Sequence, residues 1–310
     1  MINFGLLLML SAAGFFWGPL GSHEYDGRSV NDLMQAVGHA TAQDENLELT
    51  QYVADSTAFH VNSVLIVGAT EALLVDAQYH VADARRLADQ IAATGKRLKG
   101  IFITHPDHDH FAGAAAIVER FPGTPVYMTA AALHHFDSTG VADFQRDKTR
   151  QPDLFPDSVI IPQVLPSTRL TVDDQAVDII PDLQGDVLTP TNSAVWIPSL
   201  RTLITGDLVF NGVHVWLAAS NEASRMAWRG ALEQITEMDP VSVVAGHKPT
   251  VDTPDQPGVI QTMIEYLTDF DEARAASNDG AELAEIMRQK YPWKVAGLLD
   301  YSARIAFQQP

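Results

Sequence analysis

Hydrophobic and polar positions follow two periods along residues 59–291. Short apolar runs bounded by turn residues predict β-strands, whereas apolar residues three and four positions apart predict helices. Strands are expected at 59–67, 71–76, 98–104, 125–128, 170–172, 176–180, 193–198, 202–205 and 241–245. Helices are expected at 30–42, 82–94, 111–121, 223–238, 258–276 and 281–291.

The order of these elements predicts an α/β fold in two strand-rich halves. Gly68-Ala69-Thr70 would join the first two strands as a hairpin, and Gly95 would end the helix at 82–94. Residues 134–162 lack a clear period, so we expect helical or irregular cover over a site there. Helices packed outside two sheets would form a four-layer αββα sandwich.

The first 22 residues carry no charged side chain. An apolar run at 4–10 followed by small residues at 11–13 is typical of a secretory signal peptide, with an N-terminal anchor or a buried apolar arm as the alternatives. Gly14 and Pro19 interrupt this stretch, which makes it a poor membrane span. We therefore expect a periplasmic or secreted protein, otherwise a cytoplasmic one, with no stable membrane span after processing and a single domain at 23–310.

The composition limits which partners and which metal-ligand types the protein can have. Of the 310 residues, 46% are hydrophobic and 19% are charged, which indicates a folded globular protein. A formal charge of −19 argues against nucleic acid and anionic membranes as partners, so we expect a small-molecule substrate. There is no cysteine, so any metal must be held by nitrogen and oxygen donors. No feature of the sequence predicts an oligomeric state.

The densest chemistry lies at residues 104–113, THPDHDHFAG, directly after the apolar run at 100–103. Residues two apart on extended chain point to the same side, so His105, Asp107 and Asp109 can converge, and His110 follows at the turn. Burying such groups unpaired would cost several kcal/mol each. A metal site is therefore the preferred interpretation, and a polar surface loop is the alternative.

Two later segments have the same form, an apolar strand that ends in glycine and a metal-binding residue type. Gly206-Asp207 follows the strand at 202–205, and Gly246-His247 follows the strand at 241–245. Each pair alone is a common turn pair. Their order after the first motif is what makes them candidates.

Together these motifs resemble those of the metallo-β-lactamase superfamily, over about Asn62 to His247. Members carry His-x-His-x-Asp-His, a later His, a bridging Asp and a last His after a strand. This chain has the variant His-x-Asp-x-Asp-His: Asp107 stands at the second His position, and His108 falls on a position that the family leaves variable. Near the family's third His the chain has Gly185-Asp186, so that ligand is either Asp186 or absent.

The resemblance implies one or two divalent metal ions. One site would consist of Asp109, His110 and His247, and the altered site of His105, Asp107 and, if it is a ligand, Asp186, with Asp207 bridging the two. Zn is expected, although the extra carboxylates also favour Fe or Mn.

The implied function is a metal-dependent hydrolase that uses a metal-bound hydroxide on an ester, lactone, amide or related bond of a small molecule. Asp109 would orient that hydroxide or accept its proton, and His214, after a glycine next to the Asp207 motif, is a second catalytic candidate. An iron-dependent oxidoreductase on the same fold and a non-catalytic binding protein with a decayed metal site are the alternatives. Structural or surface roles are expected for His60, His134 and His135, and packing roles for Trp216, Trp228 and Trp293.

Overall fold

The computed structural model describes residues 47–295 and 298–308, all within the compact unit 45–310. The signal or anchor expected at 1–22 and the helix expected at 30–42 lie outside the described residues. No helix in the described ranges is both long and apolar enough to cross a bilayer.

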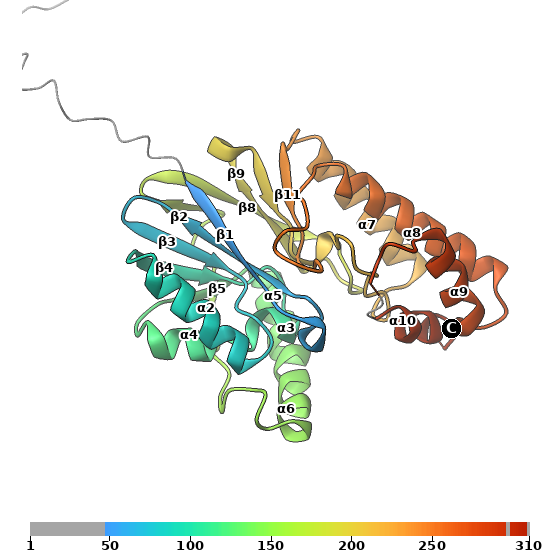
Figure 1. The fold of residues 1–310 in the computed structure, drawn as a ribbon, viewed down its shortest axis with the longest axis horizontal. Coiled ribbons are helices and arrows are strands. Elements are labelled where there is room, and N and C mark those ends of the chain that lie inside the picture. Colours follow the sequence, from blue (N-terminus) through green and yellow to red (C-terminus); the bar gives the residue numbers. More distant parts are fainter. Residues whose placement is uncertain (1–46, 296–297, 309–310) are drawn as a thin grey trace, which may run out of the picture. The chain divides into compact units, whose positions relative to one another are not determined.

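The first sheet holds six strands in the order of the chain, β1-β2-β3-β4-β5-β6. The pairs β1/β2 and β2/β3 are antiparallel, and the following pairs are parallel (Figure 1). The bounds are β1 (Glu48–Val53), β2 (Asn62–Val67), β3 (Glu71–Val75), β4 (Arg97–Phe102), β5 (Val126–Met128) and β6 (Gln163–Val164).

The second sheet holds five strands in the order β11-β10-β9-β8-β7. Only β10/β11 is parallel among its pairs. The bounds are β7 (Arg169–Val172), β8 (Gln175–Leu183), β9 (Asn192–Ile197), β10 (Thr202–Ile204) and β11 (Ser242–Val244).

Helices cover the outer face of each sheet (Figure 1). On the first sheet these are α2 (Val81–Ala93), α3 (His108–Phe111), α4 (Ala114–Arg120), α5 (Ala130–His135) and α6 (Val141–Arg150), with a π-helical turn, η2 (Phe136–Gly140), between the last two. On the second sheet they are α7 (Glu222–Thr236), α8 (Val259–Ala276), α9 (Gly280–Lys290) and α10 (Leu299–Ala306). Short 3-10 turns lie at η1 (Ser56–Ala58), η3 (Pro198–Leu200) and η4 (Gly206–Leu208).

Three apolar clusters hold the layers together. The middle one lies between the sheets, where Ile66 and Phe102 of the first sheet share a core with Val195 of the second. Each of the other two joins the outer face of one sheet to its helices. Burial of apolar surface on both faces of both sheets is the main stabilising term, and it confirms the predicted four-layer αββα sandwich.

Local details differ from the sequence prediction for identifiable reasons. The strand expected from residue 59 begins only at Asn62, because Phe59 and His60 have positive φ values of 55° and 59° and turn the chain. The helix expected at 111–121 is divided into α3 and α4. The segment 134–162 is largely helical, and β1, β6 and α10 were not predicted.

The functional motifs follow strands that end at one edge of the sandwich. Parallel strands β3 and β4 lead to residues 76 and 103–110, and parallel strands β10 and β11 lead to residues 205–208 and 245–247. Asn62 joins the two sheets here: its backbone N–H donates to the carbonyl oxygen of Gly246 over 2.7 Å, and its side-chain amide donates to that of Ala245 over 3.0 Å. The edge is thus fixed by backbone bonds between the sheets.

Candidate metal centre

The predicted histidines and aspartates from four separate segments meet at this edge. They form three groups, and within each group the donor atoms lie within 4.8 Å of one another. They are His105 with His110 and Asp207, Asp109 with His110 and His247, and His105 with Asp107 and Asp186. All seven residues that the sequence marked as metal candidates are therefore brought together.

Four donor atoms form the better-defined half of the centre. The Nε2 atoms of His110 and His247 are 3.2 Å apart, and Asp207 Oδ1 lies 3.0 Å from the first and 3.2 Å from the second. Asp109 Oδ2 lies 3.4 Å from His247 Nε2 and 3.8 Å from His110 Nε2. Tetrahedral ligands at about 2.0–2.1 Å from an ion would be about 3.3–3.4 Å apart, so these spacings suit a four-coordinate divalent metal.

The other half of the centre is richer in carboxylates. His105 is fully buried and its Nε2 atom lies 3.8 Å from Asp207 Oδ2. Asp107 and the fully buried Asp186 each bring a carboxylate oxygen within 4.8 Å of the His105 donor atom. Because the two oxygens of Asp207 face different halves, the side chain is placed as a bridge would be.

Hydrogen bonds on the far side of each imidazole ring set its tautomer. His110 Nδ1 donates to Asp76 Oδ2 over 2.9 Å, and His247 Nδ1 donates to the backbone carbonyl oxygen of Phe59 over 2.7 Å. The Thr104 hydroxyl donates to Asp76 Oδ2 over 2.9 Å, so its oxygen is left to accept from His105 Nδ1 over 2.9 Å. With all three protons on Nδ1, each Nε2 lone pair faces the centre.

Two glycines allow the backbone to approach the centre closely. A methyl group on Gly246 would lie 2.5 Å from Asp207 Oδ1, and one on Gly206 would lie 2.4 Å from the Thr104 hydroxyl oxygen. Gly206 also has a positive φ of 48°. The Gly-ligand pattern of the sequence therefore has a steric cause.

The electrostatics of the two halves differ. Burial alone would lower the pKa of His110, but Asp207 and the neighbouring carboxylates raise it well above its ordinary value. Burial raises the pKa of Asp186 well above its ordinary value, and the nearby Asp107 and Asp207 raise it further. Burial also raises the pKa of Asp107. The altered half thus concentrates negative charge that only a positive partner would stabilise in ionised form.

Buried polar atoms without hydrogen-bond partners test whether a cation fits. His105 Nε2, Asp186 Oδ2 and Asp207 Oδ1 are buried and make no hydrogen bond, although Asp207 Oδ1 lies close to two imidazole nitrogens. The facing lone pairs of His110 and His247 would repel each other at 3.2 Å. A divalent cation held by these atoms would give the buried polar atoms a partner and remove the repulsion between the lone pairs, so the donor set fits a metal.

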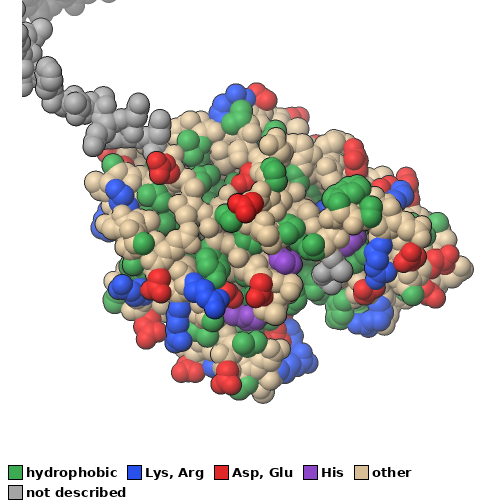
Figure 2. Space-filling model, in the orientation of Figure 1, with side chains coloured by type: hydrophobic (Ala, Val, Ile, Leu, Met, Phe, Trp, Pro, Cys, Tyr) green, Lys and Arg blue, Asp and Glu red, His purple; other side chains and the backbone are tan. Residues whose placement is uncertain are grey.

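A pocket of about 170 Å³ opens directly beside the donors. The described residues that line it are Phe59, Tyr79, Asp107, His108, Asp109, Asp147, Asp207, Trp216, His247 and Leu298. Figure 2 shows a few histidine side chains at the surface, among hydrophobic and charged ones. Four of the lining residues, Asp107, Asp109, Asp207 and His247, belong to the donor set. The donors are therefore accessible from one side.

His108, at the variable position of the motif, is held by its neighbours in this pocket. Its Nε2 atom lies 2.9 Å from Asp147 Oδ2, which also accepts a hydrogen bond from the Tyr79 hydroxyl over 2.9 Å. The hydrogen bond from His108 is the largest cause that lowers the pKa of Asp147, to about 2. Asp147 is thus an ionised anchor that fixes one wall of the pocket.

His214 lies outside this pocket. It is 3% exposed and lines a small cavity of about 30 Å³ together with His60, on the far side of His247. Its Nδ1 atom lies 2.9 Å from the Tyr266 hydroxyl, and burial lowers its pKa to about 4. A catalytic role for His214 stays a prediction; its cavity shares Phe59, His247 and Leu298 with the pocket.

The remaining candidates divide by exposure. His134 is exposed and His135 half-buried on α5, and neither lines the pocket. Trp228 is fully buried and donates to the carbonyl oxygen of Leu208 over 3.0 Å, as expected for packing. Trp293 is 63% exposed, so it does not pack in the core, and Trp216 lines the pocket.

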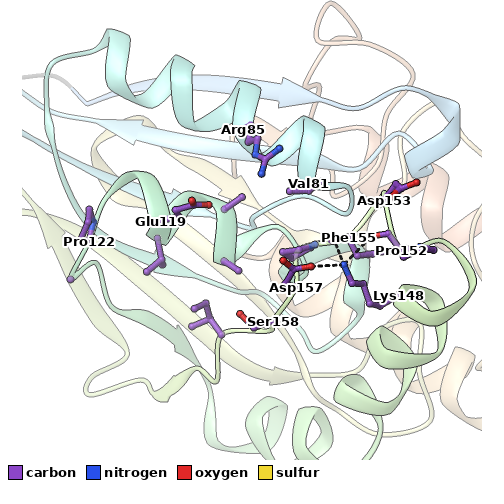
Figure 3. A pocket seen from close by; sticks show the side chains of 16 residues that line it. Val81, Arg85, Glu119, Pro122, Lys148, Pro152, Asp153, Phe155, Asp157 and Ser158 are labelled. Carbon is purple, nitrogen blue, oxygen red and sulfur yellow. Dashed lines mark hydrogen bonds and ion pairs between the residues drawn. The ribbon is translucent and has the colours of Figure 1, made fainter.

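A wider hollow of about 770 Å³ lies between α2, α4 and residues 152–160, away from the donors (Figure 3). Its Lys148 ammonium group donates to the backbone carbonyl oxygens of Pro152 and Phe155, both over 2.9 Å, and to Asp157 Oδ1 over 3.0 Å. These groups already satisfy the Lys148 ammonium group, and none of the seven donor residues lines the hollow. We therefore place the site in the smaller pocket.

Sequence reasoning missed several residues that support the site. Asp76 accepts from His110 and from Thr104, and the Asn192 amide donates to Asp186 Oδ1 over 3.1 Å. The signal for Asp76 was its place directly after the buried strand β3, although without the glycine that precedes Asp207. Asn192 carries no comparable signal, because only the β8/β9 pairing brings it to Asp186.

Two helix-covered sheets with clustered imidazole and carboxylate donors at one edge define a protein built for divalent metal binding. The family model described as the metallo-beta-lactamase superfamily matches residues 56–247. The chain belongs to the metallo-β-lactamase superfamily.

Solved structures show the same fold. The DIM-1 metallo-β-lactamase exposed to ceftazidime is 17% identical, with a TM-score of 0.53 over 75% of this chain and 98% of that chain. The structure of VMB-1 at pH 5.5 is 16% identical with a TM-score of 0.53, over 75% of this chain and 99% of that one. A double mutant of the sec-alkyl sulfatase PisA1 is 17% identical with a TM-score of 0.56, over 80% of this chain and 47% of that one. Among curated proteins, none matches the chain.

Proposed function

We propose that this protein is a metal-dependent hydrolase that cleaves an ester, lactone, amide or related bond of a small molecule. The observation that carries the proposal is the convergence of His110, His247, Asp109 and Asp207 at tetrahedral spacings beside an open pocket. Membership of a superfamily whose solved neighbours include β-lactamases and an alkyl sulfatase supports hydrolysis at the level of the reaction type.

In the proposed reaction the side chains have distinct tasks. Divalent ions bound by these donors would supply Lewis acidity and lower the pKa of water. Asp109, which joins the donor set and also lines the pocket, orients the attacking water and accepts its proton. The water oxygen adds to the carbonyl carbon, the bond to the leaving group breaks, and the leaving group takes up the proton that Asp109 accepted from water.

The oxygen-rich half of the centre favours a second candidate, an iron-dependent oxidoreductase on the same fold. His105, Asp107 and Asp186 offer one nitrogen and two carboxylates, a donor set that suits Fe or Mn better than an all-histidine set does. A decayed, non-catalytic site is disfavoured, because loss of selection would not keep three imidazoles in the ligand tautomer.

Replacement of Asp109 by alanine tests the hydrolase. We expect metal content by mass spectrometry and turnover of 4-nitrophenyl esters to fall together, with turnover falling by about 100-fold or more. Asp89→Ala, an exposed aspartate on α2, serves as the matched control and should change neither. Retention of metal and turnover in Asp109→Ala refutes the proposal, and a coloured iron protein without ester turnover supports the oxidoreductase.

A further inference from the structure

Three apolar side chains line the pocket beside the metal donors, and we call them its apolar wall. They are Phe59, Trp216 and Leu298, from the turn before β2, the loop after β10 and the residue before α10. The volume of about 170 Å³ accommodates a group of at least about six non-hydrogen atoms, at roughly 30 Å³ for each water-sized atom. A substrate arm, meaning a side group of that size, would contact the apolar wall while the reactive bond of the substrate faces the donors.

Trp216 is held in place by a stacked aromatic ring and by its buried neighbours in the chain. Its ring stacks on Tyr301 of α10, with centroids 5.4 Å apart and planes 10° from parallel. The guanidinium group of Arg304 lies over the other ring of this pair, 4.7 Å from the Tyr301 centroid. Val215 and Leu217 on either side are buried, at 0% and 1% exposure. A rigid aromatic side chain loses little conformational entropy when a ligand packs against it.

Carboxylates dominate the charges around the pocket. Four of the ten described lining residues are aspartates, and none of the ten is a lysine or an arginine. The basic groups beside Asp147 of this lining are already paired with it: His108 Nε2 lies 2.9 Å from Asp147 Oδ2, and Arg146 and Arg150 lie 3.5 and 3.8 Å from Asp147 Oδ1. An anionic substrate arm would therefore find no lysine or arginine to bind among the described lining residues.

The altered half of the centre strengthens this preference. With Asp107 and Asp186 added to Asp109 and Asp207, four carboxylates face the metal positions. Their four negative charges would offset those of two divalent ions in full. Two imidazoles in place of Asp107 and Asp186 would leave a net positive centre. This chain thus lacks the positive field that attracts anions.

We propose that the substrate carries an uncharged apolar arm, such as a short alkyl acyl or phenyl group, which packs on Trp216, Phe59 and Leu298, and that substrates with an anionic arm are disfavoured. This inference rests on the proposed hydrolase function. It assigns Trp216 to substrate contact in addition to the expected packing role, since this side chain also packs against the core of the second sheet and its helices.

Two matched probe pairs test the inference on the metal-loaded protein. Hexanamide and glutaramate are compared by ligand-observed NMR titration, and 4-nitrophenyl hexanoate and 4-nitrophenyl hydrogen glutarate by kcat/KM. We expect the uncharged member to be favoured at least tenfold in each pair. Trp216→Ala should weaken hexanamide binding about tenfold and leave glutaramate binding unchanged. Trp293→Ala is the control, because this exposed tryptophan does not line the pocket, and it should change both by less than twofold.

The outcomes separate the two proposals. If hexanamide binding depends on Trp216 but no ester is cleaved, the apolar arm stands and the hydrolase fails. If esters are cleaved but the glutarate is accepted as well as the hexanoate, or Trp216→Ala leaves both hexanamide binding and hexanoate turnover unchanged, this inference is wrong and the hydrolase stands. Leu298→Arg should raise the relative kcat/KM of the glutarate ester, and failure to do so in a folded variant also counts against the inference.

Discussion

Replacing Asp76 by asparagine keeps the size of the side chain but removes a charge from beneath two of the metal-donor histidines. The carboxylate accepts from His110 Nδ1 over 2.9 Å, from the Thr104 backbone N–H over 2.8 Å and from the Thr104 hydroxyl over 2.9 Å. An asparagine has only one acceptor oxygen. In either orientation of the amide, one N–H group would face another N–H group.

The magnitude follows from these contacts. A lost hydrogen bond to a buried charged group costs about 1.5–3 kcal/mol, so the metal-free Asp76→Asn protein should unfold more easily by that amount. If the amide N–H group faces His110, the imidazole would move its proton to Nε2 and lose its metal-facing lone pair; if it faces the Thr104 backbone N–H, His110 keeps a weaker, uncharged acceptor. Removal of such an outer partner weakens metal binding about 10–100-fold, equivalent to about 1.4–2.8 kcal/mol. The expected losses of unfolding free energy and of metal-binding free energy are thus of similar size.

Metal affinity is measured by competition with a chromophoric chelator, and stability by urea unfolding of the metal-free protein. Asp89→Asn makes the same chemical change at an exposed position of α2 and is the control. If Asp76→Asn matches the unaltered protein both in urea unfolding and, within about twofold, in metal affinity, the assigned role of Asp76 beneath His110 and Thr104 is wrong.

Two further changes probe the altered half and the interior. Asp107→His restores the second histidine of the family motif and should raise the affinity for Zn²⁺ relative to Mn²⁺, whereas Asp89→His should not; an unchanged ratio would remove Asp107 from the donor set. Burial lowers the pKa of Lys294 to about 8 from 10.5, so the unfolded chain binds the additional proton between those pH values. The free energy of unfolding should therefore rise by up to about 3 kcal/mol from pH 8 to 10.5, and an equal rise in Lys294→Met, measured by urea unfolding, would contradict this.

Much of the fold and of the donor set follows from local sequence. The helix at 82–94 could be predicted because its buried residues Ala84, Leu87, Ala88 and Ile91 recur at helical spacing. Most of the candidate donors could be found because they follow an apolar strand, and because close backbone approach requires glycine at Gly206 and Gly246. Asp186 was a candidate only through the family resemblance. Such signals lie within a few residues of one another in the sequence, where the spacing of residues determines which side chains share a face.

The rest depends on contacts between distant segments. Asp147 reaches His108 across 39 positions, and no local rule distinguishes it from the other aspartates of α6 and its surroundings. Tyr301 positions Trp216 from a helix that the sequence did not predict. The wall of the pocket was therefore not predictable, although the metal donors were.

A crystal structure of the metal-loaded protein, with anomalous diffraction at the Zn and Mn edges, tests the carboxylate-rich two-metal centre directly. We predict two ions that share Asp207. One should lie within about 2.5 Å of donor atoms of His110, His247 and Asp109, and the other within that distance of His105, Asp107 and Asp186. A single ion with Asp107 and Asp186 far from it, or no ion at this edge, would contradict the carboxylate-rich two-metal centre.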